Sequence, residues 1–292
     1  MGVRADGYHN LESVFAPLDW FDELSVVCRS ASTPQVDLSC RRADDAVENS
    51  PLDVPDGPEN LAHQAADLFL ERAGRVACIQ LDLVKRIPAA AGLGGGSSDA
   101  GAVLRALTQI WPEDLSQSEI EEVALSLGAD VPFFLDPTPS LVTGIGGEIQ
   151  PVETFPALYL LLANPGEPLA TASVFRAWDA LSPSLTPAAP GSTLRALSVF
   201  LESELDQVGH NWAVLKDLLM NDLEEAARRL CPEVGGLMAS MAECGARSVS
   251  MSGSGATVFG VFDSLERAGV AQKNLALGDA GWSRLAASQS GR

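Results

Sequence analysis

The sequence has no long apolar run and very little lysine. Hydrophobic residues make up 46% of the 292 residues, but no uninterrupted run approaches the roughly 18 residues of a membrane-spanning helix. Only Lys85, Lys216 and Lys273 occur, and the net charge is −20. Binding of nucleic acid needs a basic face. We therefore expect neither nucleic acid nor a membrane as a partner, although a local loop and Mg²⁺ could still hold the phosphates of a nucleotide.

Paired cysteines are also lacking. The cysteines lie at positions 28, 40, 78, 231 and 244, with no Cys-x-x-Cys pair and no histidine at ligand spacing. This pattern argues against a zinc site and against a disulfide framework. The chain also opens without a secretory leader pattern. We expect free thiols and a cytoplasmic protein.

Glycine, in contrast, is concentrated in one segment. Residues 92–96 hold four glycines in five positions, between a strand pattern at 77–84 and a helical pattern at 97–111. Glycine lets the backbone approach a ligand closely, and the N-terminus of the following helix adds partial positive charge. Together these features predict an anion site, most naturally for phosphate. This phosphate loop comprises Pro88, Ala89, Ala90, Ala91, Gly92, Leu93, Gly94, Gly95, Gly96, Ser97 and Ser98.

The loop matches neither of the two commoner phosphate motifs. A Walker A loop would need a lysine after Gly96, and a dinucleotide fingerprint would need glycine at position 97, which is serine. A purely structural alternative stays open from these residues. In that alternative the segment is a tight turn with Ser97 or Ser98 as the helix N-cap.

Four motifs in order resemble the GHMP kinase family. The run Pro-x-x-x-Gly-Leu-Gly-Gly-Gly-Ser-Ser resembles its ATP-binding motif, residues 127–134 (Leu-Gly-Ala-Asp-Val-Pro-Phe-Phe) its catalytic aspartate segment, and residues 252–257 its C-terminal glycine loop. The opening segment Arg4-Ala-Asp-Gly-Tyr-His9 resembles the matching segment in a narrower branch of the family. The kinases of this branch phosphorylate 4-diphosphocytidyl-2-C-methyl-D-erythritol in the non-mevalonate isoprenoid pathway.

The organisation of the chain agrees with an α+β protein of two lobes. The pattern changes near residue 150, where an apolar strand at 157–163 opens a second half with several helices and two further strands. The resemblance implies a ribosomal-protein-S5-like domain at 1–150, a ferredoxin-like domain at 151–292 and an active site between them. Asn60 is the expected N-cap of a helix, and Ser116 with Glu119 forms the pattern of a capping box.

Asp130 is the candidate catalytic residue. It follows a glycine that ends a predicted helix and precedes Val-Pro. From these residues alone, an Asx turn that satisfies its own backbone is the better interpretation. The resemblance favours the other one, in which the carboxylate accepts or orients the proton of the attacking substrate hydroxyl.

Aromatic residues are the candidates for base recognition. The resemblance implies that Tyr8 and Phe175 stack on a cytosine and that His9 hydrogen-bonds it, with Phe15 near the same substrate. The structural alternative places these side chains in the core or at its edge. The resemblance also implies that Ser252, Gly253, Ser254 and Gly255 close over the substrate phosphates. Without it, that segment is a tight turn, as we expect for Gly144–Gly147.

Lys85 and Asn60 match positions that lie near the adenine in the family. Their alternatives are a solvated strand end and a helix cap, and the sequence does not decide between them.

One departure from the family concerns the start of the chain. The family carries a strand with a Pro-x-Lys-x-Asn-type motif before the Arg-x-Asp-Gly-Tyr-His segment, whereas this sequence opens at Met1-Gly-Val-Arg4. We expect that the start has been given too late. The alternative is a degenerate copy, a nucleotide-binding relic with impaired catalysis.

The resemblance implies an ATP-dependent kinase that phosphorylates the 2-hydroxyl of a cytidine diphosphate conjugate. ATP and Mg²⁺, carried on the ATP phosphates, are the expected cofactors, no metal bound by protein residues alone is expected, and the protein is expected to be a monomer or homodimer. A GHMP kinase for a sugar or mevalonate is the alternative within the family. Those substrates carry no base for Phe175 to stack on.

Overall fold

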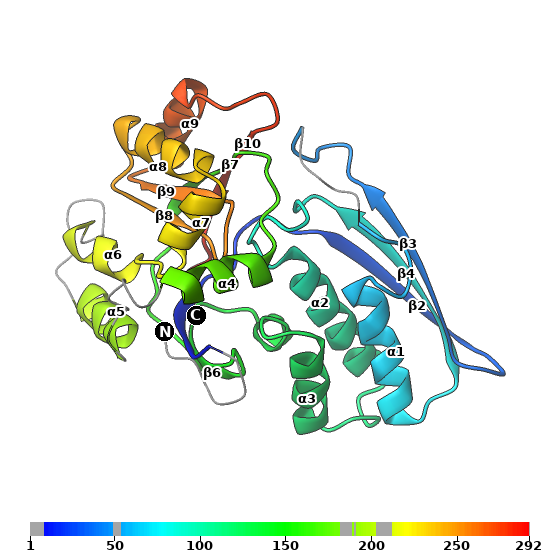
Figure 1. Cartoon of the computed structure of the whole chain (residues 1–292). Helices are drawn as coiled ribbons and strands as arrows, with labels where there is room; N and C mark the ends of the chain where they lie inside the picture. The colour runs from blue at the N-terminus through cyan, green and yellow to red at the C-terminus, as the bar shows by residue number, and fades with distance from the viewer. Residues whose placement is uncertain (1–8, 49–53, 182–188, 190, 203–211, 292) are drawn as a thin grey trace.

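The computed structural model describes residues 9–48, 54–181, 189, 191–202 and 212–291. It shows strands and helices in both halves of the chain, which confirms the α+β class. Figure 1 shows one sheet with its helices at the right and a second group of strands and helices at the upper left. Tyr8 lies outside the described residues.

A three-stranded sheet dominates the first half. Its order is β2 (Glu23–Ser30), β4 (Ala77–Lys85) and β3 (Gln35–Arg42), with β4 antiparallel to β2 and parallel to β3. Alternate residues of β4 are buried, because helices α1 (Leu61–Ala73) and α2 (Gly95–Ile110) cover one face of the sheet. Helix α3 (Gln117–Leu127) packs on these two helices (Figure 1).

A smaller sheet follows the order β1 (Leu11–Phe15), β5 (Ser140–Gly144) and β6 (Glu148–Pro151). The turn from Gly144 to Gly147 joins β5 to β6, which confirms the predicted hairpin. A short 3₁₀ helix, η1 (Pro132–Leu135), precedes β5 and contacts α2 and α3.

The second half is ferredoxin-like. Strands β7 (Tyr159–Asn164), β8 (Ser248–Met251), β9 (Val258–Phe262) and β10 (Trp282–Ala287) form an antiparallel sheet in the order β10-β7-β9-β8. In chain order this is the fourth, first, third and second strand, with helices between the first and second strands and between the third and fourth. The helices are α4 (Thr171–Leu181), α5 (Ser192–Glu202), α6 (Trp212–Leu218), α7 (Glu224–Leu230), α8 (Glu233–Glu243) and α9 (Leu265–Asn274).

A shared core joins the two halves. One buried cluster lies under the β2-β4-β3 sheet and another lies between the ferredoxin-like sheet and its helices. A third cluster takes Trp20 and Ile87 from the first half and Leu160, Val261 and Trp282 from the second. The indole rings of Trp20 and Trp282 meet edge to face at 5.8 Å. The two halves therefore pack as one body.

Local capping signals predicted helix boundaries well, with one exception. The Asn60 side chain accepts a hydrogen bond from Ala62 N, and Ser116 and Glu119 form the expected capping box. Helix α2, however, begins at Gly95 rather than Ser97, with Gly94 as its N-cap at φ 68°. The serine N-cap alternative is therefore wrong, because the glycine conformation starts the helix earlier and Ser98 N donates to Gly94 O at 2.8 Å.

Gly101 offers a test of the packing between α2 and η1. A Cβ at Gly101 would lie 2.5 Å from Phe134 Cβ and 2.9 Å from Phe134 O. We expect Gly101→Ala to lower the free energy of unfolding by about 1–3 kcal/mol, the usual effect of overpacking. The control is Gly236→Ala in α8, where a Cβ meets nothing within 4 Å. Better helix propensity should stabilise that variant by up to about 1 kcal/mol. Urea unfolding measures both, and a Gly101→Ala protein as stable as the parent would contradict this packing.

Candidate active site

The phosphate loop has the irregular backbone that its composition predicts. Three of its residues have positive φ: Ala90 at 52°, Gly92 at 74° and Gly94 at 68°. The last of these caps α2, so the N-terminus of that helix opens directly from the loop. Residues Gly95 and Gly96 contribute the first backbone N–H groups of the helix, which have no acceptors within it. This geometry can bind an anion.

The second glycine loop, Ser252–Gly255, lies against the first. Ser252 Oγ donates to Gly92 O at 2.8 Å. A Cβ on Gly92 would lie 2.6 Å from Ser252 O and 2.7 Å from Gly255 O. Only glycine allows this approach, so the backbones of the two loops touch.

Two polar side chains hold the second loop in place. Asn221 donates through Nδ2 to Met251 O and to Gly253 O, each at 2.8 Å. The hydroxyls of Thr171 and Ser254 are 2.9 Å apart. Because Thr171 is the first residue of α4, the loop is connected directly to that helix.

Helix α4 brings Phe175 to His9. The two rings are 4.8 Å apart, and the indole of Trp178 meets the imidazole edge to face at 5.4 Å. His9 Nε2 lies 2.8 Å from Asp179 Oδ1. The predicted base-recognition residues His9 and Phe175, far apart in sequence, are therefore neighbours. The carboxylate of Asp179 orients the His9 imidazole beside the Phe175 ring.

Aromatic contacts complete a closed circuit of neighbours. Phe15 of β1 meets Phe133 edge to face at 5.2 Å, and Phe133 meets Phe134 at 5.1 Å. The Phe134 ring reaches the phosphate loop, because a Cβ on Gly94 would lie 3.1 Å from its Cζ. The circuit thus runs from the first glycine loop through the second loop, α4, His9, β1 and η1 back to the first loop. Phe15 packs against Phe133 within this circuit, and its expected role near the substrate stays a prediction.

Asp130 lies just before η1. Its side chain is exposed, and the described part of the chain offers its carboxylate no hydrogen-bond partner. The Asx-turn interpretation therefore finds no support among these contacts. Desolvation by the surrounding protein raises the pKa of the Asp130 carboxyl. Both properties suit a carboxyl that is open to solvent on one side and surrounded by protein on the others.

Lys85 and Asn60, the two residues expected near an adenine, both make structural contacts. Lys85 is buried, with its ammonium between Asp22 and Asp99. It is therefore neither a solvated strand end nor open to a ligand. Asn60 is also buried, caps α1 and donates to Pro55 O at 2.7 Å. The helix cap is therefore confirmed for Asn60, and its place near the adenine stays a prediction.

Several residues of this region carried no readable signal in the sequence. Asp22 accepts hydrogen bonds from the backbone N–H groups of Arg86 and Ile87, which directly precede the phosphate loop. Glu12 of β1 accepts from Gly191 N at 2.7 Å and Leu194 N at 3.0 Å, where α5 begins. These contacts, like those of Asn221, join segments distant in sequence. No spacing rule would have found them.

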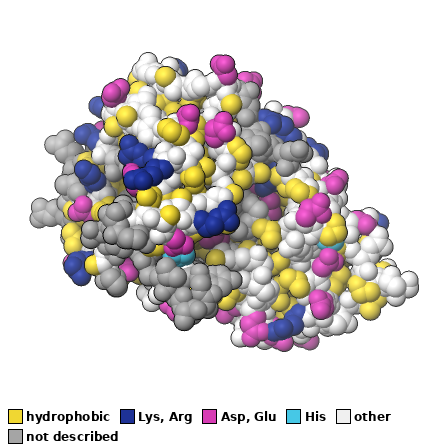
Figure 2. Space-filling model, viewed as in Figure 1, with side chains coloured by type: hydrophobic (Ala, Val, Ile, Leu, Met, Phe, Trp, Pro, Cys, Tyr) yellow, Lys and Arg dark blue, Asp and Glu magenta, His cyan; other side chains and the backbone are white. Residues whose placement is uncertain are grey.

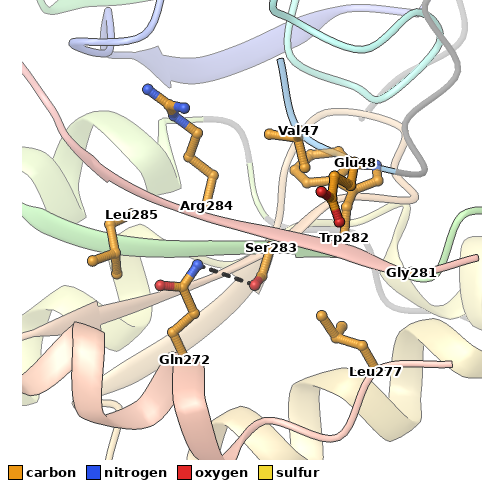
Figure 3. A pocket seen from close by; sticks show the side chains of 9 residues that line it. All are labelled: Val47, Glu48, Gln272, Leu277, Gly281, Trp282, Ser283, Arg284 and Leu285. Carbon is orange, nitrogen blue, oxygen red and sulfur yellow. Dashed lines mark hydrogen bonds between the residues drawn. The ribbon is translucent and has the colours of Figure 1, made fainter. Parts of the chain in front are cut away.

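A cavity of about 610 Å³ does not contain the predicted residues. It lies between Val47 and Glu48 on one side and β10 with the end of α9 on the other (Figure 3). Gln272 donates to Ser283 Oγ at its wall. Residues 88–91 of the phosphate loop line a second, narrow hollow, and Trp282 lines both this hollow and the cavity. The circuit around the glycine loops, rather than this cavity, gathers the groups that suit phosphoryl transfer.

The surface agrees with the acidic composition. On the face in Figure 2, Lys and Arg side chains lie in small separate groups rather than in one basic patch. None of the described helices has the length and apolarity needed to cross a bilayer.

Comparison with known proteins identifies the family of this chain. Residues 60–136 match the N-terminal domain of GHMP kinases, and residues 200–278 match the C-terminal domain. The matches contain the first glycine loop and Asp130 in one case and the second glycine loop in the other. The chain belongs to the GHMP kinase family. The expected two-lobed GHMP kinase fold is confirmed.

Similar proteins narrow the comparison. A 4-diphosphocytidyl-2-C-methyl-D-erythritol kinase of Citrifermentans bemidjiense is 36% identical over 90% of this chain and 85% of its own length. One of Desulfotalea psychrophila is 39% identical over 89% and 79%. A crystal structure of 4-(cytidine 5'-diphospho)-2C-methyl-D-erythritol kinase has a TM-score of 0.73 at 33% identity, covering 99% of this chain and 94% of that one. Homoserine kinase from Cytophaga hutchinsonii, at 18% identity, a TM-score of 0.69 and coverage of 96% and 95%, shares the fold.

The contact at Gly92 yields a prediction with a matched control. Gly92 and Gly74 both have positive φ, of 74° and 60°, but a Cβ on Gly74 would meet nothing within 4 Å. We expect Gly74→Ala to cost about 1–2 kcal/mol of stability and to leave ATP binding unchanged. Gly92→Ala should also separate the two glycine loops. It should therefore weaken ATP binding at least about tenfold, or 1.4 kcal/mol. Calorimetric titration with Mg·ATP measures both variants, and equal affinities would refute the role of the loop contact.

Proposed function

We propose that this GHMP kinase transfers the γ-phosphoryl group of ATP to the 2-hydroxyl of 4-diphosphocytidyl-2-C-methyl-D-erythritol. The observation that carries the proposal is the closed circuit of contacts, which puts two glycine loops, the Asp130 carboxylate and the His9–Phe175 pair around one region. The similarity to kinases of this substrate over most of the chain supports it.

In this proposal the first glycine loop and the N-terminus of α2 bind the phosphates of ATP. The backbone N–H groups of Gly95 and Gly96 and the hydroxyls of Ser97 and Ser98 face developing negative charge without needing to reorganise. The second loop, Ser252–Gly255, covers the substrate diphosphate from the ferredoxin-like half. Its contact with Gly92 keeps donor and acceptor phosphates adjacent.

Asp130 handles the proton. As the 2-hydroxyl oxygen attacks the γ-phosphorus, its proton passes to the Asp130 carboxylate and the bond to the β-phosphate oxygen breaks, releasing ADP. The raised pKa of Asp130 makes its carboxylate a better proton acceptor than an ordinary aspartate. It also keeps the carboxyl protonated to higher pH, so the rate should fall as pH falls through that pKa.

Mg²⁺ fits this site as a partner of ATP. Among the described residues no group of three or more His, Cys, Asp or Glu side chains is arranged to hold a metal, whereas Mg²⁺ commonly uses one or two protein oxygens together with substrate phosphates. Asp130 and the hydroxyls of Ser97 and Ser98 are the oxygen ligands available. When bound, Mg²⁺ would neutralise charge on the transferred group.

Phe175 and His9 would select the base. Phe175 offers a ring face for stacking, and His9, held through Nε2 by Asp179, offers its remaining ring edge for hydrogen bonding. Tyr8 precedes His9 directly and is the second stacking residue in the proposal.

The domain boundary near residue 150 also remains a proposal. The order of the β7–β10 sheet supports a second domain that starts between β6 and β7. The core shared by Trp20 and Trp282 joins the two domains closely.

The first test is transfer itself, with Asp130→Asn as the decisive variant. Purified protein with Mg·ATP should convert the cytidine conjugate to its 2-phosphate, detected by ³¹P NMR, and should leave mevalonate and homoserine unchanged. Asp130→Asn should retain ATP binding but lose about 10²–10⁴-fold in kcat, because it cannot accept the proton. Asp82→Asn, an exposed neutralisation on the outer face of β4, is the control. ATP binding without transfer would favour the relic, and a mutant with kcat near that of the parent would return Asp130 to a structural role.

Base selection is tested at Phe175. Phe175→Ala should weaken binding of the cytidine substrate by about 1–3 kcal/mol, the usual contribution of a base-stacking aromatic. Phe175→Leu keeps apolar volume against the core cluster of the ferredoxin-like half and should be more stable than the alanine variant. It should still lose most of the affinity for the cytidine substrate that the alanine variant loses. The KM for ATP should not change in either variant. A parallel loss for both ligands would mean that Phe175 only supports the fold.

A further inference from the structure

Three charged side chains are buried together beneath the start of α2. The side chains of Asp22, Lys85 and Asp99 are 2%, 2% and 4% exposed. The Lys85 ammonium pairs with Asp22 and lies 2.6 Å from Asp99 Oδ2. Burying charges is unfavourable compared with an apolar cluster of similar volume. A cluster of this kind therefore calls for a role other than stability.

Each member comes from a different segment that borders the phosphate loop. Lys85 is the last residue of β4, and Asp99 lies in the first turns of α2. The loop runs between them, so the ammonium ties the end of the strand to the beginning of the helix. Asp22, from the segment before β2, accepts from Arg86 N at 2.5 Å and from Ile87 N at 2.9 Å. It fixes the two residues that lead into the loop.

The cluster also supports the helix from below. A Cβ on Gly95 would lie 2.9 Å from Ile87 Cγ2 and 3.6 Å from Lys85 Nζ. The first residue of α2 therefore rests on the head of Lys85. Any shift of this ammonium moves the backbone that carries the N–H donors of the helix N-terminus.

We propose that Asp22, Lys85 and Asp99 are positioning residues for ATP, which hold the end of β4 and the first turn of α2 in the geometry that binds the phosphates. This inference deepens the proposed function and rests on the first glycine loop being the ATP site. The ammonium also offsets two carboxylates that would otherwise repel the phosphates bound above them.

Two substitutions at Asp99 separate geometry from charge. Asp99→Ala removes the tie to Lys85 and should weaken Mg·ATP binding at least about tenfold, since small misplacements of a binding group are amplified in this way. The KM for the cytidine substrate should stay within a factor of two or so, because His9 and Phe175 lie elsewhere. Asp99→Asn keeps an oxygen in place for Lys85, so it should bind Mg·ATP with an affinity close to that of the parent.

The control is the ion pair at the opposite end of α2. Arg75 Nη2 donates to Asp114 Oδ1 at 2.6 Å, joining the segment before β4 to the segment after α2. Asp114→Ala should lower the melting temperature and leave ATP affinity unchanged. Equal losses of ATP affinity in Asp99→Ala and Asp114→Ala would overturn the proposal, as would an Asp99→Asn protein that binds ATP as weakly as Asp99→Ala. If Asp99→Ala does not fold, the nearly isosteric Asp99→Leu takes its place, and an unchanged Mg·ATP affinity in that variant would overturn the proposal. Calorimetric binding keeps this result separate from transfer, since the positioning role can fail in a protein that still phosphorylates its substrate.

Discussion

A contact between two backbones is the constraint on which the site depends. The carbonyl groups of Ser252 and Gly255 lie where a Cβ of Gly92 would be. This approach lets a loop from the first half and a loop from the ferredoxin-like half share one surface, with Ser252 Oγ bonded to Gly92 O. The other elements of the site are arranged around this point, through Thr171 on one side and Phe134 on the other.

Interactions between residues close in sequence could be predicted, whereas those between distant segments could not. Helix caps at Asn60 and Ser116 are set by residues within one turn, and both were predicted correctly. The fold class and the family were predicted from motifs in which glycine meets the backbone requirements of the loops. The start of α2 was placed too late, because the left-handed Gly94 begins the helix before any serine can cap it.

Long-range partners were beyond prediction from one sequence. Lys85 looks like any lysine at a strand end until Asp22 and Asp99 enclose it, from segments that only the fold brings together. The same holds for Asn221, which binds two carbonyls of the strand and loop around Ser252. Conversely, Asp130 could be named as a candidate from its motif. Its raised pKa, and the lack of a hydrogen-bond partner for it among the described residues, became visible only in three dimensions.

The core shared by Trp20 and Trp282 has a consequence for how such proteins diverge and how they can be recombined. A chimera that joins the first half of one homologue to the second half of another, with the crossover between β6 and β7, would mix two sets of side chains in a single interior. The tryptophan near the N-terminus and the last strand must be inherited as a pair, along with Ile87 at the entrance to the loop. A crossover between the two halves of the sequence would therefore disrupt the packing of the shared core. The residues on both sides of the interface have to be exchanged together, rather than either half alone.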